Sequence, residues 1–119
     1  MVISRQEKIL ERLLKKKGIN KYQIVYSSGE GKSLPGSRFN WEIESESGFV
    51  ITKEGKIFQY WFDWDEKQEE YTFSEWKELK KKKDWKFFLD VLRDYPDVPA
   101  KLGLSKKQLQ ERVKSHLTE

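Results

Sequence analysis

The stretch FQYWFDWDEKQEEYTFSEW, residues 58–76, decides the fold, because a solvated surface would not carry so many aromatic side chains. It holds three of the five tryptophans, and each buried aromatic side chain removes about 150–250 Å² from water. Ahead of its acidic turn, aromatic residues alternate along one strand face, while Ile57 and Trp61 share the other. Two partly apolar faces predict a central strand. The alternating residues are Phe58, Tyr60, Phe62 and Trp64.

The composition predicts one domain spanning residues 1–119. Because the chain has no cysteine, disulfides, thiolate metal sites and cysteine nucleophiles are excluded, which is typical of a cytoplasmic protein. No run approaches the roughly 20 apolar residues of a membrane span, so we expect no membrane partner. The 37% of charged residues, rich in Lys and Glu, is a thermophile-like composition.

Charge is distributed unevenly along the chain. Residues 1–21 have a net charge of +5, residues 22–76 of −6, and residues 77–119 of +5. A polyanionic partner should therefore contact the two basic ends and avoid the acidic middle.

Helical spacing of apolar residues predicts an N-terminal helix over residues 4–17, with Ser4 as its N-cap. Period-two alternation then predicts a strand over residues 22–26. The segment SSGEGKSLPGS, residues 27–37, is rich in Gly and Ser and is interpreted as a mobile loop.

Alternation is clearer still over residues 38–44, which predicts a strand with one solvated face. Ser47 and Gly48 indicate a turn before the strand FVIT, and KEGK at residues 53–56 indicates another. Residues 38–62 are therefore predicted to form an antiparallel meander.

Two interpretations fit the residues that follow the acidic turn. The segment YTF, residues 71–73, is either a short fifth strand or the lead into a helix. Thr72 and Glu75 have the spacing of a capping box, and Trp76 and Leu79 continue a helical face. The sequence favours a strand followed by a helix.

Two more helices are predicted near the C-terminus. Asp84 is the expected N-cap of the first, whose apolar residues recur at helical spacing until Pro96. The last begins at Ser105, which forms a capping box with Gln108. The fold class is α+β: an antiparallel four- to five-stranded meander with an N-terminal helix and C-terminal helices packed on it.

Motifs for catalysis and cofactor binding are weak. SSGEGKS resembles a phosphate-binding loop, but the glycine that the pattern requires is replaced by Tyr26. Asp63, Asp65 and Glu66 are candidate oxygen ligands for Mg²⁺ or Ca²⁺, although a solvated hairpin tip explains them better. The only histidine, His116, follows a Lys-rich segment and lacks a nucleophile partner. We therefore expect no enzyme, no metal and no cofactor.

The segment VPAKLGLSKKQLQERVKSHL, residues 98–117, resembles the turn and second helix of a helix-turn-helix. In that arrangement Lys106, Lys107 and Gln110 would face a nucleic-acid groove. The prolines before Gly103 leave scarcely one turn for a first helix, so a capped helix that packs on the sheet is the preferred interpretation.

Runs of lysine are the strongest functional signal. The function predicted from them is a small non-catalytic binding domain that binds nucleic acid electrostatically, without sequence readout. The alternative is a protein-interaction or homo-oligomeric assembly module, in which acidic and basic surfaces meet a protein partner or a second copy. The candidate nucleic-acid-binding residues are Lys15, Lys16, Lys17, Lys80, Lys81, Lys82, Lys83, Lys106 and Lys107.

Overall fold

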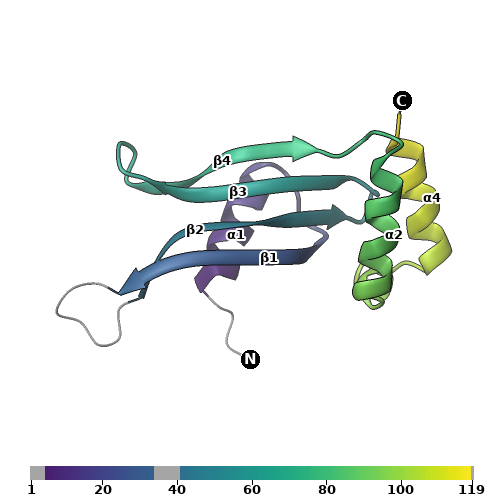
Figure 1. Cartoon of the computed structure of the whole chain (residues 1–119), viewed down its shortest axis with the longest axis horizontal. Coiled ribbons are helices and arrows are strands. Elements are labelled where there is room, and N and C mark those ends of the chain that lie inside the picture. The colour runs from purple at the N-terminus through teal and green to yellow at the C-terminus, as the bar shows by residue number, and fades with distance from the viewer. Residues whose placement is uncertain (1–4, 34–40, 119) are drawn as a thin grey trace.

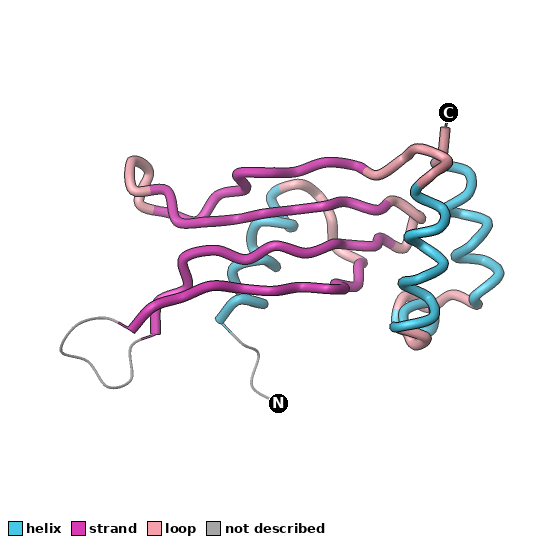
Figure 2. The backbone as a smooth tube through the Cα atoms, in the orientation of Figure 1, coloured by secondary structure: helices cyan, strands magenta, loops and turns pink. Residues whose placement is uncertain are grey.

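The computed structural model describes residues 5–33 and 41–118 and has the predicted α+β fold. One antiparallel sheet has the strand order β1-β2-β3-β4, so each strand pairs with the next one along the chain (Figures 1 and 2). A helix precedes the sheet and three follow it. The elements are α1 (Arg5–Lys16), β1 (Tyr22–Ser33), β2 (Trp41–Thr52), β3 (Ile57–Asp65), β4 (Glu70–Glu78), α2 (Asp84–Asp94), α3 (Val98–Lys101) and α4 (Lys106–His116).

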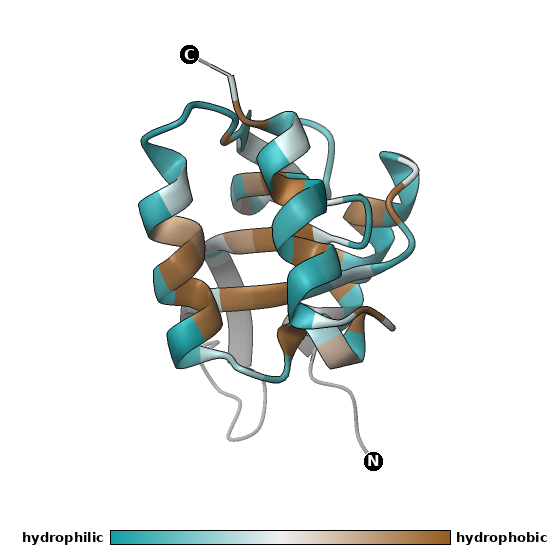
Figure 3. Cartoon of the chain, turned by 90° about the vertical axis from the view of Figure 1, so that its right-hand side faces the viewer, coloured by the Kyte–Doolittle hydropathy of each residue, from teal (hydrophilic) through white to brown (hydrophobic). Residues whose placement is uncertain are grey.

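Helices cover the sheet unequally on its two faces. Helix α1 lies across one face, whereas α2 and α4 lie side by side at one end of the molecule (Figures 1 and 3). In Figure 3 apolar segments of the strands are visible behind this helix pair. Two hydrophobic clusters result, one between α1 and the sheet and one between the sheet and the C-terminal helices.

The aromatic stretch that opens at Phe58 forms β3 and most of β4, and β3 is an interior strand as predicted. Tyr60 and Phe62 are fully buried against α1, while Ile57 is buried on the opposite face. Trp61 is 43% exposed and belongs to neither hydrophobic cluster.

The predicted turn at Ser47 and Gly48 is wrong, because β2 continues through both residues. Gly48 lies directly opposite Tyr60, and a Cβ atom on it would stand 2.9 Å from the Tyr60 hydroxyl oxygen. The ring therefore occupies the space of the missing side chain, and its hydroxyl donates to Glu46 Oε2 at 3.1 Å. Gly48 therefore allows the Tyr60 side chain to approach the β2 backbone closely, and it does not form a turn.

The loop predicted from residue 27 onward is also wrong over the part of it that the structure describes. Strand β1 extends to Ser33, and Ser28 to Ser33 pair with residues 41–47 of β2. Register shifts after Val25 and after Glu30 accommodate the polar, glycine-containing sequence. Ser4, the expected N-cap, and the strand start predicted at residues 38–40 lie outside the described residues.

The helix predicted through Trp76 and Leu79 is replaced by strand β4, which runs to Glu78. Trp76 pairs with Tyr60 in the β-ladder, and the Leu79 amide donates to the Ile57 carbonyl oxygen at 2.7 Å. Pairing with β3 gives the backbone N–H and C=O groups of this segment their hydrogen-bond partners. The segment therefore does not form the helix that the capping-box spacing indicated. The meander therefore has four strands, and YTF is part of the last.

The C-terminal helices follow the predicted signals closely. The predicted N-cap at Asp84 is wrong, because Asp84 is the first residue of α2 and Lys83 is the N-cap. The Asp84 carboxylate instead accepts the Lys81 amide at 3.0 Å, ahead of the helix. Helix α3 is the single turn that the prolines allow. At α4 the predicted capping box is confirmed: the Gln108 amide donates to Ser105 Oγ at 3.1 Å, and the Ser105 amide donates to Gln108 Oε1 at 2.9 Å.

Tyr26 attaches β1 to the end of α2. It has a positive φ of 50°, and its hydroxyl donates to Asp94 Oδ2. Its amide donates to the Tyr95 hydroxyl oxygen at 3.0 Å, and the two rings meet edge-on at 5.0 Å. The hydrogen bond to Asp94 raises the pKa of Tyr26 to about 12, because it stabilises the protonated hydroxyl. The Tyr26 hydroxyl, followed by Arg93, lowers the pKa of Asp94.

Tyr26→Phe is expected to raise the pKa of Asp94 toward its ordinary value, because the substitution removes the hydroxyl donor. In the native chain the ionised carboxylate stabilises the fold above about pH 4, and this stabilisation is lost as the pH falls through the lowered pKa. On the alkaline side, the Tyr26 contribution is complete below about pH 10 and is lost as the pH rises through about 12. A carbon-13 NMR titration of Asp94 measures the acid-side change. Tyr71→Phe, on β4, is the control, and an unchanged Asp94 pKa in Tyr26→Phe would contradict the assignment.

Candidate functional site

A basic trough crosses the end of the sheet where α4 docks. Its larger part is a cleft of about 710 Å³ between the α1–β1 loop, the β2–β3 hairpin, β4 and α4. A neighbouring cleft of about 450 Å³ shares Asn20, Lys21 and Lys53 with it and continues to the α3–α4 turn. We call these two clefts together the basic trough. The charged residues that line it are Lys17, Lys21, Lys53, Lys56, Lys101, Arg112 and Glu54.

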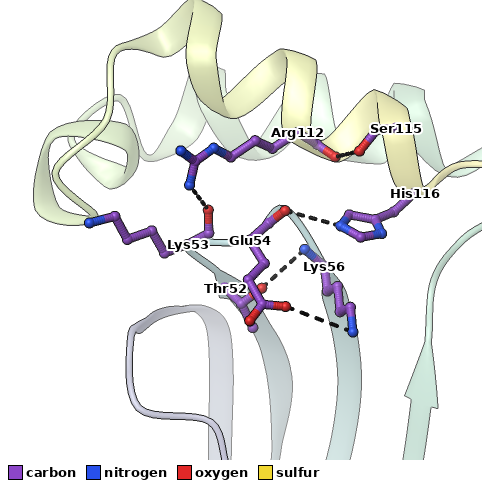
Figure 4. A network of polar contacts seen from close by, with 7 residues as sticks. All are labelled: Thr52, Lys53, Glu54, Lys56, Arg112, Ser115 and His116. Carbon is purple, nitrogen blue, oxygen red and sulfur yellow. Dashed lines mark hydrogen bonds and ion pairs between the residues drawn. The ribbon is translucent and has the colours of Figure 1, made fainter.

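At the trough wall, two side chains of α4 contact backbone carbonyl oxygens of the β2–β3 hairpin (Figure 4). Arg112 Nη1 donates to the Lys53 carbonyl oxygen at 3.0 Å, and His116 Nε2 lies 3.1 Å from the Glu54 carbonyl oxygen. Gly55, with φ of 96°, allows this close approach, because a Cβ atom there would stand 2.5 Å from the Arg112 carbonyl carbon. The hairpin backbone that carries Lys53 and Lys56 is thereby held against α4.

Backbone pairing also places the basic residues of different segments together. The Lys53 amide donates to the Lys21 carbonyl oxygen at 3.1 Å, which sets the end of β2 beside the α1–β1 loop. Within the hairpin, the Lys56 amide donates to Thr52 Oγ1 at 3.1 Å, and Lys56 Nζ lies 3.8 Å from Glu54 Oε2. This exposed ion pair is the only carboxylate contact that a lining lysine makes among the described ion pairs, so most of the positive charge of the trough is uncompensated.

An aromatic pair forms one side of the larger cleft. The rings of Phe58 and Trp76 are stacked with centroids 4.6 Å apart and an interplanar angle of 19°. Lys17 Nζ lies 4.8 Å from the Trp76 ring centroid and 5.7 Å from that of Phe73. This cation–π contact holds the Lys17 ammonium at the trough wall.

The lysines singled out from the sequence lie in three separate places. Lys17 lines the trough. Lys16 Nζ lies 4.0 Å from Glu70 Oε2, and Lys15 is exposed near the end of α1. Lys106 and Lys107 are exposed in the first turn of α4.

The run Lys80 to Lys83 is exposed in the β4–α2 connection, where Lys81 pairs with Thr118 just beyond the C-terminal end of α4. An 11-residue helix is about 16 Å long. This run and Lys106 therefore lie at opposite ends of α4 and do not share a surface patch.

Sequence reasoning missed most residues of the trough. Lys21, Lys53, Lys56, Lys101 and Arg112 come from four segments that are distant in the chain, and none lies in a lysine run. The only local signal was the KEGK turn, which presents two lysines at a hairpin tip. The remaining cations are brought to it by tertiary structure.

The acidic hairpin has a structural role in its own turn. Asp65 Oδ1 accepts the amides of Lys67 and Gln68 at 2.9 and 3.2 Å. Among the side chains that the structure describes, no three from His, Asp or Glu are grouped as metal ligands would be.

No protein-family model, curated protein or solved structure matches this chain. Of the helices described, none is both long and apolar enough to cross a membrane. The geometry of the trough is therefore the basis for a functional assignment.

Proposed function

We propose that this chain is a small non-catalytic domain that binds nucleic acid through its basic trough, by contacts to phosphate and without sequence readout. The observation that carries the proposal is the charge of the trough: six basic residues and one acidic residue line one continuous concave surface. Clustered cations release condensed counterions when they bind a phosphate backbone, which favours binding to any sequence.

The trough is also organised before any ligand arrives. The Arg112 guanidinium is positioned by its hydrogen bond to the Lys53 carbonyl oxygen, and the Lys53 amide donates a hydrogen bond to the Lys21 carbonyl oxygen. Lysine side chains act as flexible point charges and suit phosphate better than base edges. Binding that is tight at low salt and indifferent to sequence is the behaviour expected of such a surface.

Replacing Lys21, Lys53 and Lys56 together with glutamine should weaken binding and flatten its dependence on salt. Each lost phosphate contact lowers the slope of log K against log salt by about 0.7–0.9, so the triple variant should lose about 2–3 units of slope. Fluorescence anisotropy with a labelled oligonucleotide across a salt series measures both quantities.

The matched control replaces three lysines outside the trough, Lys67, Lys77 and Lys86, which are also exposed. It removes the same charge but should leave the slope within about one unit. Equal losses in both triple variants would contradict the trough as the site. Absence of binding at low salt would overturn the proposed function altogether.

The lysine run at Lys80 to Lys83 remains a second candidate contact surface. Its replacement with glutamine separates the two surfaces: a flattened slope there, with the trough variant unaffected, would move the site to the β4–α2 connection. We expect the larger effect at the trough, because its cations converge on a cleft whereas the run lies exposed beside the C-terminal residues.

A protein-interaction function is the second candidate, and the exposed Trp61 favours it. This ring is 43% exposed, and Trp61 lies opposite Glu75 of β4 in the sheet. An exposed aromatic residue beside a carboxylate suits a basic protein segment. Light scattering over a range of protein concentrations tests self-association, and a strict monomer that binds nucleic acid would contradict assembly as the main role.

A further inference from the structure

We propose that the trough accepts an unpaired strand, with one base stacked on Trp76 in the place that the Lys17 ammonium now occupies. This inference rests on the proposed function and adds the class of nucleic acid. Phosphate contacts alone do not require the stacked Phe58 and Trp76 rings that line the same cleft.

Lys17 occupies the position that a base would take. Its ammonium lies 4.8 Å from the Trp76 ring centroid, within cation–π distance. Stacking of a base on an aromatic ring is stronger than a cation–π contact at an exposed site. A base can therefore displace the ammonium, which is released on its flexible stem toward the phosphate of the same nucleotide. The exchange keeps both protein groups in contact with the ligand.

The size and position of the cleft favour a single strand over a duplex. A cleft of about 710 Å³ has the dimensions of a small-molecule pocket. In a duplex the base faces are stacked on one another, so no face is available to a half-buried tryptophan. An unpaired strand offers both its phosphates and its base faces. Lys21, Lys53 and Arg112 would then contact phosphates on either side of the stacked base.

The test compares a 15-nucleotide oligothymidylate, a 15-base-pair duplex and thymidine monophosphate by anisotropy and competition at one low salt concentration. We expect the single strand to bind at least 10-fold more tightly than the duplex. Trp76→Leu should weaken single-strand binding about 10-fold and change duplex binding less than twofold. Lys17→Gln should lower the single-strand salt slope by about 0.7, as expected for one phosphate contact.

Trp76→Phe covers the case in which the leucine variant does not fold, because it keeps an aromatic ring. It should retain most of the single-strand affinity while losing the fluorescence quenching that a base stacked on the indole produces. Trp61→Leu is the matched control on the other face of the sheet and should bind like the native chain.

Three results would overturn the inference while leaving the proposed function intact: a duplex that binds as tightly as the single strand, a Trp76→Leu variant with unchanged single-strand affinity, or quenching that persists in Trp76→Phe. Thymidine monophosphate binding as tightly as the 15-mer would also overturn it, because the site would then be a mononucleotide pocket. Failure of both polymers to bind would instead reject the proposed function.

Discussion

Gly55→Ala is expected to lower the free energy of unfolding by about 3 kcal/mol. Two effects contribute: the strain of a left-handed backbone at a residue with a Cβ atom, and overpacking against α4. The Gly55 φ of 96° strains any residue with a Cβ atom. The added atom would also stand 2.5 Å from the Arg112 carbonyl carbon and 2.6 Å from the Val113 amide nitrogen. Because both atoms belong to the α4 backbone, relief requires the helix to move away from the hairpin.

Gly18→Ala is the matched control for the backbone strain alone. Gly18 has a similar φ of 79°, but nothing lies within 4 Å of the added Cβ atom. This variant should lose only about 1–2 kcal/mol. Urea denaturation of the two variants measures the difference, which is the energetic effect of the hairpin–α4 contact. Equal losses would show that α4 does not depend on a close approach at Gly55.

Phe88→Ala is expected to destabilise the chain by about 3–5 kcal/mol, the usual range for a fully buried phenylalanine. Phe88 is 0% exposed and belongs to the cluster that joins α2 to the sheet and to α4. Removing its ring leaves a cavity between layers that are held mainly by this cluster. The same urea denaturation experiment, performed at neutral pH, measures the loss.

Leu89→Ala is the control for the Phe88 prediction because it changes the next residue of the same helix. The Leu89 side chain is 41% exposed, so its removal should cost less than about 1 kcal/mol. A similar loss in both variants would mean that α2 contributes through its helicity and not through docking on the sheet.

Local signals predicted the elements that carry their own caps and periodicity. The α4 capping box at Ser105 and Gln108 is present. The apolar residues whose helical spacing predicted α1 are buried against the sheet. Two apolar faces correctly indicated an interior position for β3. These signals act between residues close in the chain, so no knowledge of the fold was needed to interpret them.

Predictions failed where a distant strand changed the outcome. Gly48 lies within a strand because Tyr60, 12 positions away, covers it. Trp76 is in β4 because β3 supplies its backbone partners, although Thr72 and Glu75 have helix-start spacing. Residues 28–33 are in β1 because β2 is long enough to pair with them. Turn and helix propensities are weak beside a complete β-ladder.

The sequence by itself determined the α+β class, the α4 capping box, the interior aromatic strand and the positive charge of both ends of the chain. Only the tertiary structure decided which basic residues share one surface. Lys21, Lys53 and Arg112 converge because the β1–β2 ladder and the approach of α4 to Gly55 bring their backbones together. Charge is a property of each residue, whereas a binding surface depends on distances between residues that are far apart in the chain.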